Sequence, residues 1–231
     1  MGMWFLIKYL RIKQLINALG DDDRRESAMR SLVFIGKPAV KQLIAVLKHN
    51  RDRLGRRSRC IYILMYVIKV LGDIKDKRAI GQLIAFLDDI DPNVRKEVID
   101  ALVKIGKPVV ESLIIALNEK HPYVRWGAAK VLGEIKDPRA VEPLFAALQT
   151  IPLCPVGDEM DARECLIWAL TELKDNRLIE PLIELLKSKE TRVRWAAIAG
   201  LHNITGQNFG EDAQKWEEWW EENKEKVKKG K

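Results

Sequence analysis

Apolar residues recur along this chain at helical spacing, and the helices that they predict come in similar pairs. In His121–Leu148, "HPYVRWGAAKVLGEIKDPRAVEPLFAAL", apolar residues three or four positions apart predict a first helix over Tyr123–Ile135. The segment "KDPRA" follows, in which Asp137 is a good helix N-cap and Pro138 suits the first helical position. A second helix then carries its apolar residues on one face. This stretch therefore predicts two helices joined by a tight turn.

The same pair of helices recurs along most of the chain. The N-terminal "RIKQLINAL" resembles a second helix alone, so we expect about six helix pairs preceded by one extra helix. The strict alternation typical of β-strands is absent, and no sheet is predicted. One helix pair cannot bury its apolar face alone, so neighbouring pairs must stack and both ends need caps. The copies lie at Asp21–Leu47, Tyr66–Leu87, Asp91–Leu117, Asp161–Leu186 and Lys189–Gly206, the last with a partner helix at Glu211–Lys228.

The repeated pattern D-P-x-V-R-x-x-A-x-x-A-L-x-x-I-G-D-x-R-A-V-x-x-L-x-x-A-L resembles the short HEAT-like repeat of the phycobilisome-lyase type, over residues 12–206. The resemblance implies an all-α fold, a right-handed α-α superhelix (HEAT-like solenoid) whose second helices line a concave face. We expect residues 1–231 to form a single repeat domain, with a C-terminal cap and basic tail over 207–231. The resemblance implies a macromolecular partner in most such proteins, although bilin lyases of this repeat type attach a pigment.

The C-terminal segment "KWEEWWEENKEK" places Trp216, Trp219 and Trp220 at spacings of three and four residues, on one face of a helix. An exposed end of a repeat array must be covered, so these residues predict a Trp-rich capping helix. The alternative is an aromatic groove that binds a peptide.

Charge is distributed unevenly, although the chain as a whole carries +7. Residues 1–80 hold 18 Lys and Arg against 7 Asp and Glu, whereas residues 81–231 hold 22 against 26. The insertion "HNRDRLGRRSR" is rich in guanidinium groups, which suit phosphate, so a nucleic acid or another polyanion is a possible partner. The favoured alternative is a solvated basic loop, or one that pairs with the acidic residues Asp21–Asp23. Its arginines are Arg51, Arg53, Arg56, Arg57 and Arg59.

A second charged feature is predicted for the concave face, where the second helices repeat two polar positions. One of them, the position of Glu142, passes from basic to acidic along the chain, as expected of a surface that orients a charged partner. Solvated helix faces that differ by chance are the alternative. We predict that this charged stripe binds a partner; its residues are Lys13, Lys41, Arg78, Glu111, Arg139, Glu142, Arg177 and Glu180.

Arginine also recurs at one place in the first helices. The series could form a ladder of anion sites, but a position set by the repeat usually serves the repeat. We therefore favour a structural role, in which each arginine pairs with helix caps and backbone carbonyls. The residues are Arg25, Arg95, Arg125, Arg163 and Arg194.

Candidate chemistry is sparse. The sequence has no phosphate-binding loop, no dinucleotide motif, no H-E-x-x-H and no plausible catalytic triad, so we predict neither an enzyme nor a cofactor. The three histidines are far apart and the three cysteines form no C-x-x-C pair, so no metal site or disulfide framework is predicted and a cytoplasmic location is expected. The most apolar stretch, Cys60–Gly72, is too short to span a membrane.

The segment "QTIPLCPVGDEMD", Gln149–Asp161, contains two prolines and is predicted to be a loop, a place where binding residues are often found.

Taken together, the sequence predicts a non-catalytic scaffold that binds another protein on the concave face. The alternatives are nucleic-acid binding through the basic N-terminal third and, second, a chromophore lyase-type enzyme. The high content of Lys, Glu and Arg would suit a thermophile. The oligomeric state stays open.

Overall fold

The structure is a computed structural model that describes the backbone of residues 2–51, 58–150 and 162–229. Side chains are described within residues 6–50, 60–148 and 164–227. The described residues lie in helices and short turns, and this part of the chain contains no β-strand. The all-α fold predicted from the helical spacing is therefore confirmed.

Two compact units make up the chain, residues 1–112 and 113–231, and the division falls within α7. The prediction that residues 1–231 form a single domain stays a prediction. The helices of the first unit, ending with the shared α7, are α1 (Gly2–Ala18), α2 (Arg25–Ile35), α3 (Lys37–Arg51), α4 (Ser58–Ile74), the 3₁₀ turn η1 (Lys77–Ala79), α5 (Ile80–Ile84), α6 (Pro92–Ile105), η2 (Lys107–Val109) and α7 (Val110–Ala116).

The second unit continues the same alternation of a first helix and a second helix in each pair. Its elements are α8 (Pro122–Ile135), η3 (Pro138–Ala140), α9 (Val141–Thr150), α10 (Ala162–Glu172), η4 (Asn176–Leu178), α11 (Ile179–Leu185), α12 (Thr191–Thr205) and α13 (Ala213–Lys229). Within the described residues, the extra helix α1 is thus followed by six helix pairs, as the repeats predicted.

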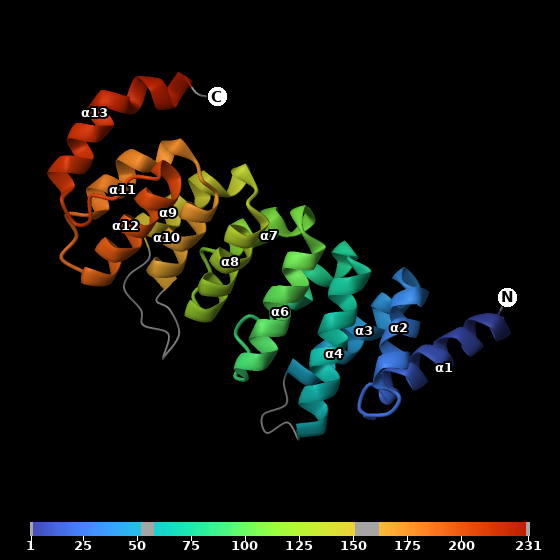
Figure 1. The fold of residues 1–231 in the computed structure, drawn as a ribbon. Coiled ribbons are helices and arrows are strands. Elements are labelled where there is room, and N and C mark those ends of the chain that lie inside the picture. Colours follow the sequence, from blue (N-terminus) through green and yellow to red (C-terminus); the bar gives the residue numbers. More distant parts are fainter. Residues whose placement is uncertain (1, 52–57, 151–161, 230–231) are drawn as a thin grey trace. The chain divides into compact units, whose positions relative to one another are not determined.

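First helices pack side by side within each unit, as Figure 1 shows for α4 with α6 and for α8 with α10. Their inward residues are fully buried, for example Leu71 and Leu102 in the first unit and Leu132 and Leu166 in the second. Each pair leaves an apolar face that the next pair covers, so stacking provides the burial that a single pair lacks.

The turn inside a pair differs slightly from the expected one. Lys136 ends α8 in the left-handed region with a φ of 56°, and Asp137 then caps the 3₁₀ turn η3 rather than α9 itself. The Asp137 side chain accepts a hydrogen bond from the backbone N–H of Arg139, and Pro138 occupies the first position of the turn. Asp137 and Pro138 therefore start the second helix of the pair at the predicted place. They do so through a 3₁₀ turn that precedes the α-helix α9.

The C-terminal helix α13 packs against α11 and caps the last helix pairs. Trp216 and Trp220 are buried, and Trp216 meets Phe209 edge to face with ring centroids 4.8 Å apart. The predicted Trp-rich capping helix is confirmed.

The two insertions are described only at their edges. The helix α3 continues to Arg51 and α4 begins at Ser58, so part of the first insertion extends a helix. The rest of it, and nearly all of the predicted loop Gln149–Asp161, lies outside the described residues. Among the helices described, none is both long and apolar enough to cross a membrane.

Candidate functional site

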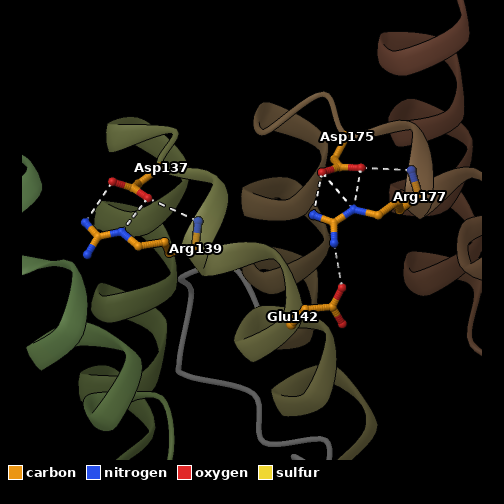
Figure 2. A network of polar contacts seen from close by, with 5 residues as sticks. All are labelled: Asp137, Arg139, Glu142, Asp175 and Arg177. Atoms are coloured by element: carbon orange, nitrogen blue, oxygen red, sulfur yellow. Dashed lines mark hydrogen bonds and ion pairs between the residues drawn. The ribbon is translucent and has the colours of Figure 1, made fainter. Parts of the chain in front are cut away.

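Three half-exposed arginines of the charged stripe are held by the aspartate that precedes each of them by two residues. In Figure 2, Arg139 donates from Nε and Nη2 to the two carboxylate oxygens of Asp137, both at 2.9 Å. Arg177 makes the same two contacts with Asp175, including a 2.8 Å bond from Nη2. We call this arrangement the Asp–Arg clasp. Because the aspartate also caps the turn, the clasp ties the arginine to the backbone of its own repeat.

The first unit contains a third clasp, in which Arg78 binds Asp76 at 3.0 Å from Nε and at 2.8 Å from Nη2. The carboxylate of Asp76 is buried while the guanidinium of Arg78 is about half exposed. The side-chain hydrogen bonds from Arg78 lower the pKa of Asp76 from 3.8 to about 2, against the raising effect of burial. Both partners of this clasp are therefore charged at neutral pH.

Clasps also reach the neighbouring helix pair. Arg177 donates from Nη1 to Glu142 Oε1 at 2.9 Å, and Glu142 lies at the start of α9 in the pair before it (Figure 2). Arg78 donates from Nη2 to the carbonyl oxygen of Lys37 at 2.9 Å, again one pair earlier. The side chains of Arg78 and Arg177 are therefore held by residues of two neighbouring helix pairs. Because they are already ordered, they lose less conformational entropy when a partner binds.

The clasp predicts a pH dependence of stability. Because the folded-state pKa of Asp76 lies near 2, below its usual 3.8, the stability that it contributes is fully present above about pH 4 and is lost as the pH falls through about 2. We expect Asp76→Asn to be less stable than the parent chain at pH 5, with a gap that narrows towards pH 2. Urea unfolding at several pH values measures this gap. The exposed Asp100→Asn is the control, and a gap independent of pH would contradict the assignment.

All eight residues predicted for the charged stripe are exposed. The structure brings Glu142 and Arg177 into direct contact and holds Arg78, Arg139 and Arg177 in clasps. Exposure is required of a binding surface but does not demonstrate one, so a partner-binding role for this stripe stays a prediction.

The arginines that recur in the first helices bond to backbone carbonyl oxygens, in agreement with the structural role that the repeat favoured. Arg95 donates from Nη1 to the carbonyl oxygens of Asp89 and Ile90, at 2.8 and 3.3 Å. Arg125 and Arg194 bond in the same way to the carbonyls that precede their own helices. Arg25 likewise donates from Nε to the carbonyl oxygen of Leu19, at 3.1 Å. These carbonyls lie at the ends of the preceding segments, where backbone acceptors lack helical partners. The side chain of Arg163 lies outside the described residues.

The predicted polyanion cluster cannot be placed in the fold. Arg53, Arg56 and Arg57 lie outside the described residues. Arg51 ends α3 and Arg59 lies near the start of α4, but the side chains of these two residues are not among those described.

A groove between two first helices of the second unit is a candidate site that sequence reasoning missed. It has a volume of about 440 Å³, within the range of small-molecule sites. Its lining is largely aromatic and aliphatic, with one ion pair: Arg192 Nε lies 3.6 Å from Glu164 Oε1. We call it the α10–α12 groove; it is lined by Glu164, Trp168 and Thr171 of α10 and by Arg192, Trp195, Ala196 and Ala199 of α12.

A sequence signal for this groove did exist. The tripeptide "VRW" occurs in α8 and again in α12, where it places Trp126 and Trp195 directly after an arginine of the structural series. That arginine faces backbone carbonyls, so the next residue must point to another side of the helix. Trp195 is 61% exposed, which is unusual for a residue of its size.

The buried cysteine of this region is not a reactive group. Burial raises the pKa of the Cys165 thiol to about 12, and the thiol donates a weak hydrogen bond to the carbonyl of Trp126 at 3.5 Å. A neutral, enclosed thiol is a poor nucleophile. Among the described residues, no group of three or more His, Cys, Asp or Glu side chains could hold a metal ion.

Comparisons with known proteins indicate which class of protein this chain belongs to. A family model of HEAT repeats matches residues 56–114 and 110–152. The chain is 31% identical over 142 residues to the bilin biosynthesis protein RpcF of Synechococcus sp. (strain WH8020), which covers 60% of this chain and 68% of that protein. It is 28% identical over 148 residues to the phycocyanobilin lyase subunit beta of Nostoc sp. (strain PCC 7120), which covers 61% of this chain and 74% of that subunit.

A solved structure supports the same assignment at the level of fold. The complex of CpcE and CpcF of phycocyanin lyase from Nostoc sp. PCC7120 aligns with a TM-score of 0.51 and 23% identity, covering 78% of this chain and 68% of that chain. This chain belongs to the HEAT-like repeat family of the phycobilisome-lyase type, as the repeated pattern indicated.

Two functional expectations need correction. The prediction of a non-catalytic scaffold was wrong, and so was the prediction that the chain is not an enzyme, because the matched relatives are named as a lyase subunit and as bilin biosynthesis proteins. The second alternative, a chromophore lyase-type enzyme, agrees with them. The comparisons give no support to nucleic-acid binding.

Proposed function

We propose that this chain is one subunit of a lyase-type enzyme that acts on a bilin pigment. The observation that carries the proposal is the similarity to RpcF, at 31% identity over 68% of that protein's length. The similarity to a phycocyanobilin lyase subunit supports it. We also propose that the chain binds another protein. The solved structure with which it aligns is a complex of two lyase subunits, which supports a protein partner.

The chemistry that this function requires is an addition or its reverse. A protein thiol adds across an exocyclic C=C bond of the pigment, so that an S–C bond forms, the π bond is consumed and the thiol proton moves to the neighbouring carbon. No oxidant or reductant is needed. Cys165 is unsuited to supply that thiol, because burial raises its pKa to about 12. The acceptor thiol would belong to another protein, and this chain would hold and orient the pigment.

For the protein partner, we propose the charged stripe as the contact surface. Its residues are exposed, and the three clasped arginines are fixed before a partner arrives. At one repeat position of the stripe the first unit presents Lys13 and Lys41, whereas the second unit presents Glu142 and Glu180, so each unit would bind partner groups of opposite charge.

A reconstitution tests the function. The chain replaces the Nostoc lyase subunit beta in a mixture with the partner subunit, apo-phycocyanin and phycocyanobilin. We expect bilin fluorescence that stays on the denatured acceptor polypeptide, because a covalent adduct survives unfolding. The chain should also speed the loss of bilin from phycocyanin, since a catalyst accelerates both directions of one reaction.

The intact Nostoc pair is the positive control, and the mixture without either subunit is the blank. The exposed variants Lys41→Glu and Glu180→Lys are expected to reduce subunit association and adduct yield together, while Glu222→Lys on α13 leaves both unchanged. A rate equal to that of the blank in both directions, with the Nostoc pair active, would refute the proposal.

A further inference from the structure

The α10–α12 groove has a floor of small residues and a rim that carries charge. Ala196 and Ala199 lie one turn apart on α12, so a flat ligand can approach the helix closely. The helices themselves lie close together, since a Cβ added at Gly200 would clash with the side chain of Thr171. The groove is therefore part of the packing between α10 and α12, where rigid elements hold its shape.

We propose that this groove binds the linear tetrapyrrole itself, with the pigment's conjugated rings on Trp168 and Trp195 and one propionate on Arg192. The inference rests on the proposed function for the identity of the ligand. It assigns the place of binding and the residue that would meet each part of the pigment.

Trp195 is the exposed aromatic surface of the site. Its indole N–H donates to Glu211 Oε1 at 3.3 Å, which fixes the ring from the segment before α13, while the residue as a whole stays 61% exposed. Trp168 lines the groove from α10. Conjugated rings stack on indole faces with a gain beyond the area that they bury, and a preset ring loses little entropy on binding.

The two charged residues suit the polar groups of a bilin. Arg192 is 74% exposed, and its contact with Glu164 is an ion pair at 3.6 Å rather than a hydrogen bond. Its guanidinium can therefore take a propionate with paired N–H donors. Glu164 Oε1 is buried and accepts no hydrogen bond from the described residues. The Glu164 side chain as a whole keeps 19% exposure and lines the groove, so its carboxylate can accept from the pyrrole N–H groups of a bilin there.

The corresponding groove of the first unit provides a contrast. It lies between α2 and α4 and has a similar volume, about 400 Å³. Its lining is charged, with Glu26, Arg30 and Lys69, and the guanidinium of Arg25 covers the ring of Tyr66 at 4.7 Å. No indole faces this groove, so a flat apolar ligand has no stacking surface there.

A titration of the purified chain with phycocyanobilin, followed by bilin absorption and tryptophan quenching, tests the site. We expect Trp195→Ala and Arg192→Ala each to weaken binding by about tenfold, and Arg192→Lys to weaken it less, because lysine keeps the charge but loses the paired donors. Matched controls are Tyr62→Ala, an exposed aromatic residue on α4, and Arg30→Ala in the first-unit groove; both should bind as the parent chain does.

Glu164→Gln gives a spectral test that does not depend on affinity. A carboxylate beside pyrrole nitrogens favours their protonated form, so the bound pigment should absorb further to the red in the parent chain than in Glu164→Gln. Circular dichroism of each variant confirms that the helices are intact.

The outcomes separate this inference from the proposed function. Bilin binding that is insensitive to Trp195 and Arg192, or no binding by the chain while the reconstituted lyase is active, would overturn the groove as the site and leave the function standing. Binding that depends on both residues, in a chain without lyase activity, would keep the groove and refute the function.

Discussion

Trp216→Ala is expected to lower the free energy of unfolding by about 3–5 kcal/mol, the range for removing a large aromatic side chain from a core. Trp216 is the largest fully buried side chain of the described residues, with 0% exposure. Its indole N–H donates to the carbonyl of Gly210 at 3.1 Å, and its ring packs edge to face with Phe209 and Trp219. The substitution leaves a cavity and removes a hydrogen bond from the helix that covers the array end.

Urea unfolding followed by circular dichroism measures the loss. The control is Glu222→Ala, because Glu222 is exposed on the same helix and its removal should change stability by less than about 0.5 kcal/mol. If both variants unfolded at the same urea concentration, α13 would not stabilise the last helix pairs, and the capping role would fail.

Gly133→Ala is expected to destabilise the chain by up to about 2 kcal/mol, although alanine favours helix more than glycine does. A Cβ added at Gly133 would lie 2.7 Å from the Ala169 Cα and 2.8 Å from the ring of Trp168. Backbone cannot yield as a flexible side chain does, so α8 and α10 would have to move apart. Overpacking of this kind costs about 1–3 kcal/mol, and contact with backbone atoms favours the upper part of that range, above the gain of about 1 kcal/mol from helix propensity.

Gly81→Ala is the matched control, because no atom lies within 4 Å of a Cβ added at Gly81 in α5. There the propensity gain acts alone, and we expect stabilisation by about 0.5–1 kcal/mol. Thermal unfolding of the two variants should therefore shift in opposite directions. Stabilisation in both would show that α8 and α10 do not pack as closely as the structure indicates.

The comparison of Arg125 with Arg139 shows how far repeat positions can be interpreted from sequence. Both recur with the repeat, yet Arg125 bonds backbone carbonyls at 2.9 and 2.7 Å, whereas Arg139 is half exposed in a clasp with Asp137. The recurrence indicates that a position matters to the repeat. It does not indicate which acceptor the side chain meets, because that depends on where the previous segment ends.

The functional error has a related cause. A repeat pattern is dictated by the burial of helix faces, and the same faces must be buried in a scaffold and in a lyase. The absence of known catalytic motifs therefore does not distinguish a scaffold from an enzyme of this family. A lyase whose role is to hold a pigment needs a shaped, partly aromatic surface rather than a triad or a metal site.

The amino-acid sequence by itself determined the helix pairs, their turns and the C-terminal cap of this protein, because helical spacing, the Asp137 cap and the Trp216 face are local signals that act within a few residues. Tertiary structure alone decided the α10–α12 groove. Trp168 and Arg192 are 24 positions apart and lie on separate helices, so their meeting depends on how closely α12 approaches α10. That distance is set by the small residues Gly200 and Thr171 between the helices, and no periodicity in the sequence reports it.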